Sequence, residues 1–205
     1  MEDEDRWLLK AVKAFEGCKE ELESSGGIDL EAYVRALELI PLVFDSLGSV
    51  FGFAKKDIQD KAKHILASCS GKGKTIKEAV GEDFKAGRAL AGRDPEAVSR
   101  PLHRITNSLK FLNLLLKDTL REGNEEHLRV SAQKAFKESI EYYLEWVVKK
   151  AVAAGMYLLP SREAFLKKIG ETEESARGPA IRLVEVTEPI LSHVYGIYED
   201  LGIEL

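Results

Sequence analysis

Two pairs of charged residues have a spacing that could build a binding site. Asp57 and Lys61 are four residues apart, and so are Arg100 and Arg104. In a helix, residues at i and i+4 lie on one face, so each pair would present both side chains in one direction. Three cations and one carboxylate that converge could bind a phosphate and a hydrogen-bond donor together. The alternative is a solvated surface, where Asp–Lys pairs and neighbouring arginines at this spacing are common.

Other motifs give little support to catalysis or metal binding. The segment Gly71-Lys-Gly-Lys-Thr75 is similar to a phosphate-binding loop, but the first glycine of GxxxxGK[ST] would fall on Ser68. None of the histidines belongs to an HExxH motif, although His103 lies next to Arg104 and could line the same pocket. No arrangement of nucleophile and base can be argued from the sequence. We therefore predict a protein without catalytic residues, metal or cofactor.

The composition indicates a globular protein that does not bind nucleic acid. Of the 205 residues, 44% are hydrophobic, and the formal net charge of -5 disfavours non-specific contacts with nucleic acid. Cys18 and Cys69 form no motif, which is typical of free thiols in a reducing compartment. The N-terminus is acidic, unlike a targeting peptide, and no apolar run reaches the roughly 18 residues of a membrane span. We expect one domain over residues 1–205, located in the cytoplasm.

Apolar residues recur with helical periodicity along the chain, and no strand-like alternation of any length is present. We predict seven or eight helices. The expected helices begin near Trp7 and Asp29 and then span residues 55–68, 76–85, 94–120, 126–159 and 161–169, with a last stretch that ends near 201.

Prolines and glycines place the expected breaks. Pro41 should interrupt the second helix. The sequence Asp94-Pro95-Glu96 has the pattern of a helix start, and Pro101 should bend the helix that follows. Gly178-Pro179 should break the chain again, and Pro189 should bend the last helix.

Several segments are apolar on all sides and should be fully buried. They are Leu114-Leu-Leu116, Val147-Val148, Ala151-Val-Ala-Ala154 and Met156-Tyr-Leu-Leu159. They could form an ordinary core or one that opens to receive lipid chains, and periodicity does not separate the two. Trp146, Lys149, Lys150 and Tyr157 combine aromatic and cationic side chains near one helix end. That combination is typical of a membrane-surface contact and equally of a partly exposed helix.

Six blocks of sequence, taken together, are similar to one known family. They are Pro41-Leu-Val-Phe-Asp-Ser-Leu-Gly48, Phe53-Ala-Lys-Lys-Asp-Ile58, Arg100-Pro-Leu-His-Arg104, Ser108-Leu-Lys-Phe-Leu112, Trp146-Val-Val-Lys-Lys150 and Gly155-Met-Tyr-Leu-Leu-Pro160. In this order they resemble the glycolipid transfer protein family, and within it the branch of ceramide-1-phosphate transfer proteins and plant accelerated-cell-death proteins. The resemblance runs from about Phe15 to the C-terminus. It implies an all-α, two-layer helical sandwich of about eight helices, whose apolar interior holds lipid chains.

The resemblance also implies roles for the charged pairs. Asp57 matches an aspartate that accepts the ceramide amide N–H. Lys61 stands where sugar-binding members have Asn. Arg104 stands where those members have a Trp that stacks on the sugar, and Arg100 lies four residues earlier. These residues imply a phosphate head group in place of a sugar. Phe111 matches an aromatic residue that closes the apolar side of the site.

One position departs from the family pattern. The family has a His two residues before the Trp of the Trp146 block, and that His donates to the ceramide carbonyl, whereas this chain has Leu144. Either Tyr142 or Tyr143 supplies another donor, or recognition of the amide is weaker, at a cost of about 1–3 kcal/mol for one lost buried partner. A phosphoglyceride such as phosphatidic acid, which has no amide, is therefore an alternative cargo. We expect Leu144 and Phe53 to line the pocket beside the head-group residues.

We therefore expect a non-enzymatic lipid carrier that acts as a monomer. It would dock transiently on membranes through Trp146, Lys150 and Tyr157, extract one phosphate-headed lipid and carry the lipid chains in the apolar pocket. Ceramide-1-phosphate is the favoured cargo. A lipid sensor or protein adaptor with little transfer activity is a second class of function, and an enzyme acting on phospholipid is a third, for which the sequence offers no nucleophile and base. The protein would be cytoplasmic and peripheral to membranes.

Overall fold

The computed structural model describes residues 6–48, 51–69, 73–89, 94–121, 123 and 127–204. Its α-helices are α1 (Trp7–Ser25), α2 (Leu30–Leu37), α3 (Pro41–Ser46), α4 (Gly52–Cys69), α5 (Ile76–Lys85), α6 (Ser99–Thr119), α7 (Leu128–Ser139), α8 (Trp146–Gly155), α9 (Arg162–Lys168) and α10 (Glu173–Asp200). The 3-10 helices η3 (Glu141–Tyr143) and η4 (Met156–Leu158) lie on either side of α8. These described residues contain no strand, so the all-α prediction is confirmed. The acidic N-terminus, residues 70–72 of the glycine-lysine loop and the side chain of Cys69 lie outside the described residues.

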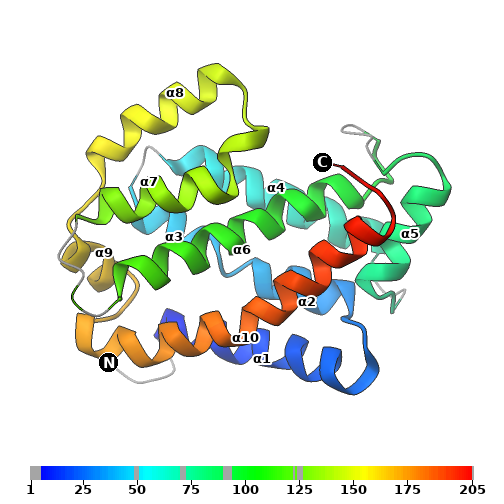
Figure 1. The fold of residues 1–205 in the computed structure, drawn as a ribbon, viewed down its shortest axis with the longest axis horizontal. Coiled ribbons are helices and arrows are strands. Elements are labelled where there is room, and N and C mark those ends of the chain that lie inside the picture. The colour runs from blue at the N-terminus through cyan, green and yellow to red at the C-terminus, as the bar shows by residue number, and fades with distance from the viewer. Residues whose placement is uncertain are drawn as a thin grey trace.

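The helices pack as two layers (Figure 1). In one layer, α10 runs along α1 and also contacts α5, while α1 contacts α2. In the other layer, α4 packs against α3 and α6, and α6 packs against α7. Contacts of α6 with α10, α5 and α2 join the layers, and α8 lies at the edge of the molecule. The arrangement confirms the predicted two-layer sandwich.

Local sequence signals place the starts of α2 and α5 as expected. The side chain of Asp29 accepts a hydrogen bond from the backbone N–H of Ala32, which caps α2. Thr75 and Glu78 form a capping box at the start of α5. An isolated antiparallel bridge between Asp29 and Thr75 joins these two helix starts across the layer.

The prediction of one long helix over residues 126–159 is wrong. Helix α7 ends at Ser139, and the backbone of Leu144 and Glu145 is extended, with ψ angles of 146° and 152°, before α8 begins. The intervening segment contains neither glycine nor proline, so the sequence carries no local signal for this break. Side chains of α6 contact η3 at this break, where Arg104 donates to the Tyr143 carbonyl and Asn107 donates to the Tyr142 hydroxyl. This break and the one between α2 and α3 bring the number of α-helices within the described residues to ten.

The predicted start of α6 at Asp94 is also wrong. The Asp94 carboxylate accepts a hydrogen bond from the backbone N–H of Glu96 at 2.8 Å, which closes a turn ahead of the helix. Helix α6 begins at Ser99, so Pro101 falls in its first turn, where a backbone N–H has no helical acceptor. The proline therefore removes no helical hydrogen bond, and it gives no reason for the expected bend.

The cap of α6 comes from the end of α5. The buried carboxylate of Asp83 accepts hydrogen bonds from the backbone N–H groups of Val98 and Ser99 at 2.7 and 2.8 Å and from the Ser99 hydroxyl at 2.7 Å. Arg88 donates to the other oxygen of Asp83 at 2.9 Å. Burial alone would raise the pKa of Asp83, but these hydrogen bonds outweigh burial and hold the pKa below its ordinary value. Asp83 thus fixes the end of the helix that carries Arg100.

Helix α10 continues through Pro179, where a break was predicted. Pro179 has no N–H, so the carbonyl of Ser175 four residues earlier loses its helical donor. The Arg6 guanidinium donates to this carbonyl at 2.9 Å and also pairs with the buried carboxylate of Glu171 at 2.7 Å. A partner far away in the sequence therefore replaces the missing hydrogen bond. Pro189 also lies inside the continuous helix.

The apolar segments differ in burial from one another. Leu115 and Leu116 are buried as expected, but Val147 is 68% exposed and Leu158 is 71% exposed. Helix α8 buries only one side, which includes Val152. The prediction of full burial is therefore wrong for the segments around α8, because the rest of the molecule covers only part of this helix.

Candidate functional site

A cavity of about 950 Å³ opens between α4, α6 and the segment from α7 to α8. Its polar part is lined by Asp57, Asp60, Lys61, His64, Asp94, Arg100, Arg104, Ser108 and Tyr143. Its apolar part includes Phe44, Phe51, Phe53, Phe111, Phe136, Ile140, Leu144, Val148 and Val152. The cavity therefore has a charged mouth and an aromatic and aliphatic interior, as an amphiphilic ligand requires.

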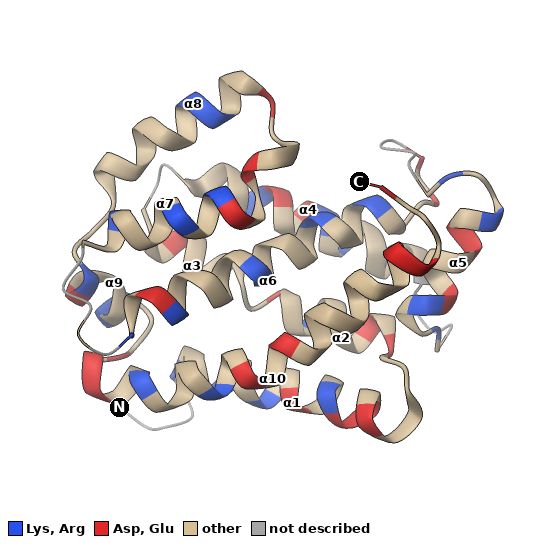
Figure 2. Cartoon of the chain, viewed as in Figure 1, with Lys and Arg blue, Asp and Glu red and all other residues tan. Residues whose placement is uncertain are grey.

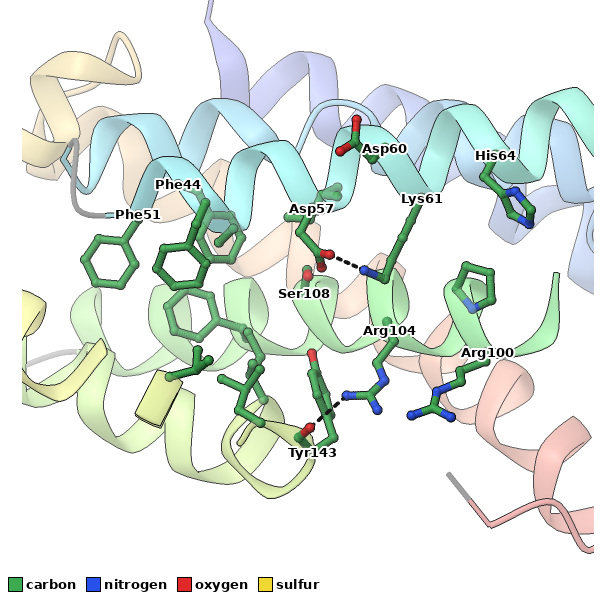
Figure 3. Close-up of a pocket in the computed structure, with 18 of the residues that line it drawn as sticks. Phe44, Phe51, Asp57, Asp60, Lys61, His64, Arg100, Arg104, Ser108 and Tyr143 are labelled. Carbon is green, nitrogen blue, oxygen red and sulfur yellow. Dashed lines mark hydrogen bonds and ion pairs between the residues drawn. The ribbon is translucent and has the colours of Figure 1, made fainter. Parts of the chain in front are cut away.

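The two charged pairs predicted from their spacing meet at this cavity (Figure 3). Asp57 and Lys61 lie on one face of α4 and form an ion pair. Arg100 and Arg104 lie on one face of α6, which packs against α4. Three cations thus line one cavity. The spacing predicted the two faces, and the packing of α6 against α4 brings them together.

Arg104 is held in place by η3. Its guanidinium donates a hydrogen bond to the Tyr143 carbonyl at 3.2 Å, and its central carbon lies 3.7 Å from the centroid of the Tyr143 ring. Burial lowers the pKa of the Arg104 guanidinium, and the charge of Arg100 lowers it further. Because an arginine starts from a pKa far above neutrality, the group stays charged. A partly buried, oriented guanidinium is well suited to bind an anion with two parallel hydrogen bonds.

Aromatic rings close the apolar side of the cavity. Phe111 of α6 is buried and stacks on Phe44 of α3, with ring centroids 5.3 Å apart and an interplanar angle of 25°. Phe53 of α4 lines the cavity and is about half exposed. Leu144 also lines the cavity and packs partly buried against the core. The structure therefore places Phe111, Phe53 and Leu144 where the sequence predicted pocket residues.

His103 does not lie at the cavity, which corrects the prediction for this residue. It is buried on another face of α6, with its ring 5.1 Å from the Tyr198 ring and 5.9 Å from the Tyr195 ring of α10. Burial lowers the pKa of His103 to about 4, and the charge of Arg104 adds to this shift. Neighbouring residues in a helix point about 100° apart, so His103 cannot share the face of Arg104. His103 is therefore a neutral side chain in the core between α6 and α10.

Several lining residues were missed in the sequence, although helical spacing could have found them. Ser108 follows Arg104 by four residues and shares its face of α6. His64 follows Lys61 by three residues on α4, and its Nε2 lies 2.8 Å from the Ala97 carbonyl oxygen. Tyr143 was predicted, together with Tyr142, as a possible donor in place of the family His, and of these two only Tyr143 is among the lining residues. Helical spacing gave no signal for it, because its position depends on the break between α7 and α8.

The residues predicted to contact membranes lie on the exposed side of α8 and η4. Trp146 is 70% exposed and Tyr157 is 71% exposed. The ammonium group of Lys150 lies 5.7 Å from the Trp146 ring centroid, and the Arg129 guanidinium lies 4.5 Å from the Tyr157 ring centroid. Helix α8 carries lysines but no acidic residue (Figure 2). Cations beside exposed aromatic rings are typical of groups that enter a lipid head-group layer.

The described residues show neither a metal-binding cluster nor a membrane-spanning helix. Within the parts of the chain that the structure describes, no three His, Cys, Asp or Glu side chains are grouped so that they could hold a metal ion. None of the helices traced there is both long enough and apolar enough to cross a membrane.

A helical sandwich with a cationic mouth above an apolar cavity has the architecture of a protein that encloses an amphiphile. The chain belongs to the glycolipid transfer protein family, since the family model described as Glycolipid transfer protein (GLTP) matches residues 28–171. A homologue of Accelerated cell death 11 from Arabidopsis thaliana is 27% identical over 198 residues, which cover 97% of this chain and 82% of the relative. A ceramide-1-phosphate transfer protein from Danio rerio is 25% identical over 204 residues, which cover 96% of this chain and 94% of the relative.

Solved structures of related proteins share the fold. A mutant of Arabidopsis Accelerated cell death 11, complexed with C12 ceramide-1-phosphate, superimposes with a TM-score of 0.89 at 21% identity and covers 97% of both chains. The human ceramide-1-phosphate transfer protein, in complex with 12:0 ceramide-1-phosphate, gives a TM-score of 0.84 at 21% identity, again over 97% of both chains. These comparisons confirm the predicted family and the predicted fold.

Proposed function

We propose that this protein carries ceramide-1-phosphate between membranes without chemical change of the lipid. The observation that supports this most directly is the convergence of Lys61, Arg100 and Arg104 at the mouth of an apolar cavity of about 950 Å³. Family membership and the ceramide-1-phosphate in two structural relatives support the same cargo class. The protein would act from the cytoplasm and touch membranes only transiently.

The charges match a phosphate monoester better than a sugar. Such a phosphate carries nearly two negative charges and three acceptor oxygens. Arg100 and Arg104 can each donate two parallel hydrogen bonds, while Lys61 acts as a point charge. Asp57 would repel the phosphate, so we assign it to the neighbouring amide N–H. The lipid chains supply most of the affinity, at about 0.8 kcal/mol per buried CH₂, and the cations supply selectivity.

The test is transfer of fluorescent lipids between vesicles. We expect fast transfer of ceramide-1-phosphate, slower transfer of phosphatidic acid and background transfer of a glycosylceramide, because a sugar offers no negative charge to the cations at the mouth of the cavity. Preference for the glycosylceramide would contradict the assignment of the cations to phosphate. Binding of lipid without delivery would indicate a sensor or adaptor instead of a carrier.

Phosphatidic acid is the second candidate cargo, and Leu144 is the observation that favours it. A leucine at this wall of the cavity cannot donate to an amide carbonyl. Transfer of phosphatidic acid at a rate equal to that of ceramide-1-phosphate would support this candidate, because both lipids present the same phosphate to the cations.

Truncation of Trp146 should slow delivery while lipid binding in solution is retained. Trp146→Ala removes the most exposed ring of α8, and loss of one large buried side chain costs about 1.5–3 kcal/mol of membrane affinity. We expect transfer to slow by about tenfold or more. Phe84→Ala is the matched control, since Phe84 is a half-exposed aromatic on α5, remote from α8 (Figure 1). Vesicle co-sedimentation and transfer rates measure both variants. Equal loss in the two variants would argue against docking through α8.

A further inference from the structure

Three polar groups occupy the zone of the cavity between its cationic mouth and its aromatic interior. They are the carboxylate of Asp57 and the hydroxyls of Ser108 and Tyr143, and all three residues line the cavity. The Tyr143 ring extends from η3 beside Arg104, and its hydroxyl end points toward Ser108 and Asp57 (Figure 3). An acceptor and two possible donors therefore line the same cavity.

The Tyr143 ring is fixed from one side by Arg104. The guanidinium stacks on the ring at 3.7 Å and donates to the carbonyl of the same residue. Burial raises the pKa of the Tyr143 hydroxyl, and it outweighs the neighbouring charge of Arg104, which lowers the pKa. The hydroxyl therefore keeps its proton at neutral pH, so it can donate a hydrogen bond.

Tyr142, the neighbouring residue, has a different role. Its hydroxyl accepts a hydrogen bond from the side-chain amide of Asn107 at 3.2 Å. Asn107 also contacts His103 and Tyr195, on the side of α6 that faces α10. Tyr142 is not among the residues that line the cavity. Of the two tyrosines in η3, only Tyr143 offers a hydroxyl to a ligand.

A ligand that forms hydrogen bonds with both the Asp57 carboxylate and the Tyr143 hydroxyl must present a donor and an acceptor close together. Polar groups that a ligand covers need hydrogen-bond partners, because an unpaired one is costly. A secondary amide has an N–H and a carbonyl on adjacent atoms, whereas an ester has only acceptors. An ester would leave the Asp57 carboxylate facing another acceptor.

We propose that Tyr143 donates to the carbonyl of an amide whose N–H is accepted by Asp57, and that this pair selects amide-linked over ester-linked phosphate lipids. The proposal rests on the carrier function proposed above. It makes Tyr143 a specificity-determining residue and gives Arg104 a second task, since the same guanidinium binds phosphate and orients the ring. Amide and phosphate recognition are thereby coupled through one side chain.

The test compares ceramide-1-phosphate with phosphatidic acid of matched chain length in the vesicle transfer assay. Tyr143→Phe removes the hydroxyl and keeps the ring under Arg104. We expect the ratio of the two transfer rates to fall by about three- to tenfold, the effect of one lost hydrogen bond, through slower ceramide-1-phosphate transfer. Tyr142→Phe is the matched control and should leave the ratio within about twofold of the wild type.

Two results would overturn the assignment of Tyr143. One is an unchanged ratio in Tyr143→Phe, and the other is equal loss of both cargoes in a variant that melts at the wild-type temperature. A wild-type protein that transfers neither lipid would instead overturn the proposed function. The two failures are therefore distinguishable in one set of measurements.

Discussion

Arg104→Leu is expected to reduce transfer of ceramide-1-phosphate by about 100-fold or more, with the fold intact. The leucine removes two charge-assisted hydrogen bonds to the phosphate, each worth about 1.5–3 kcal/mol, and about 1.4 kcal/mol corresponds to tenfold in affinity. The residue is partly buried at the cavity, so water screens the interaction less than at a free surface. The transfer rate between vesicles measures the loss of transfer. Equilibrium binding of ceramide-1-phosphate in the absence of vesicles measures the loss of affinity.

Two further variants make this result interpretable. Arg104→Lys keeps the charge but loses the planar pair of donors, so its transfer rate should lie between those of the wild type and the leucine variant. Arg35→Leu removes an exposed arginine that pairs with Glu31 of its own helix at 2.9 Å, and it should transfer at the wild-type rate. Normal transfer by Arg104→Leu would show that the head-group site lies elsewhere.

Asp83→Ala is expected to lower the free energy of unfolding by about 3–5 kcal/mol, the range for one partner removed from a buried charge pair. The change removes four hydrogen bonds from Val98, Ser99 and Arg88 and leaves buried N–H groups without an acceptor. It also uncaps the helix that carries Arg100. Denaturant unfolding measures the stability, and the remaining folded protein should transfer lipid more slowly.

Asp94→Ala is the matched control for this cap. The one hydrogen bond described for the Asp94 side chain is the one that it accepts from the Glu96 N–H. Asp94→Ala should therefore lower the free energy of unfolding by about 1 kcal/mol or less. A larger effect at Asp94 than at Asp83 would mean that the motif Asp94-Pro95-Glu96 is the true helix start.

The stability that Asp83 contributes should depend on pH. Because the folded state lowers the pKa of Asp83, this contribution is complete above the unfolded pKa of about 3.9 and is lost as the pH falls through the lower folded pKa. The wild type should therefore lose more stability than Asp83→Ala between about pH 5 and pH 2.

Features that depend on neighbours in the sequence could be predicted. The caps Asp29 and Thr75 act on N–H groups three residues away, so the starts of α2 and α5 follow from local chemistry. The pairs at i,i+4 define faces of α4 and α6 for the same reason. The convergence of the two faces needed more information, and the order of the six family blocks supplied it.

Features that depend on distant partners could not be predicted in this way. The cap of α6 lies on Asp83, sixteen residues before Ser99, and the partner of the Ser175 carbonyl is Arg6, 169 residues away. At the break before α8, η3 contacts α6. The sequence of this segment contains no local signal for the break. The position of Tyr143 in the cavity depends on that break, so it could not be derived from periodicity.

The residues that line the cavity come from α3, α4, α6, α7, η3, α8 and adjoining loops, and none of them lies in α1, α2 or α10. We therefore expect substitutions in the layer built by α1, α2 and α10 to change stability more than the choice of cargo. A designer who wants a new cargo could first raise the melting temperature through the terminal helices and then vary the cavity wall, since the added stability would offset the cost of new polar groups there.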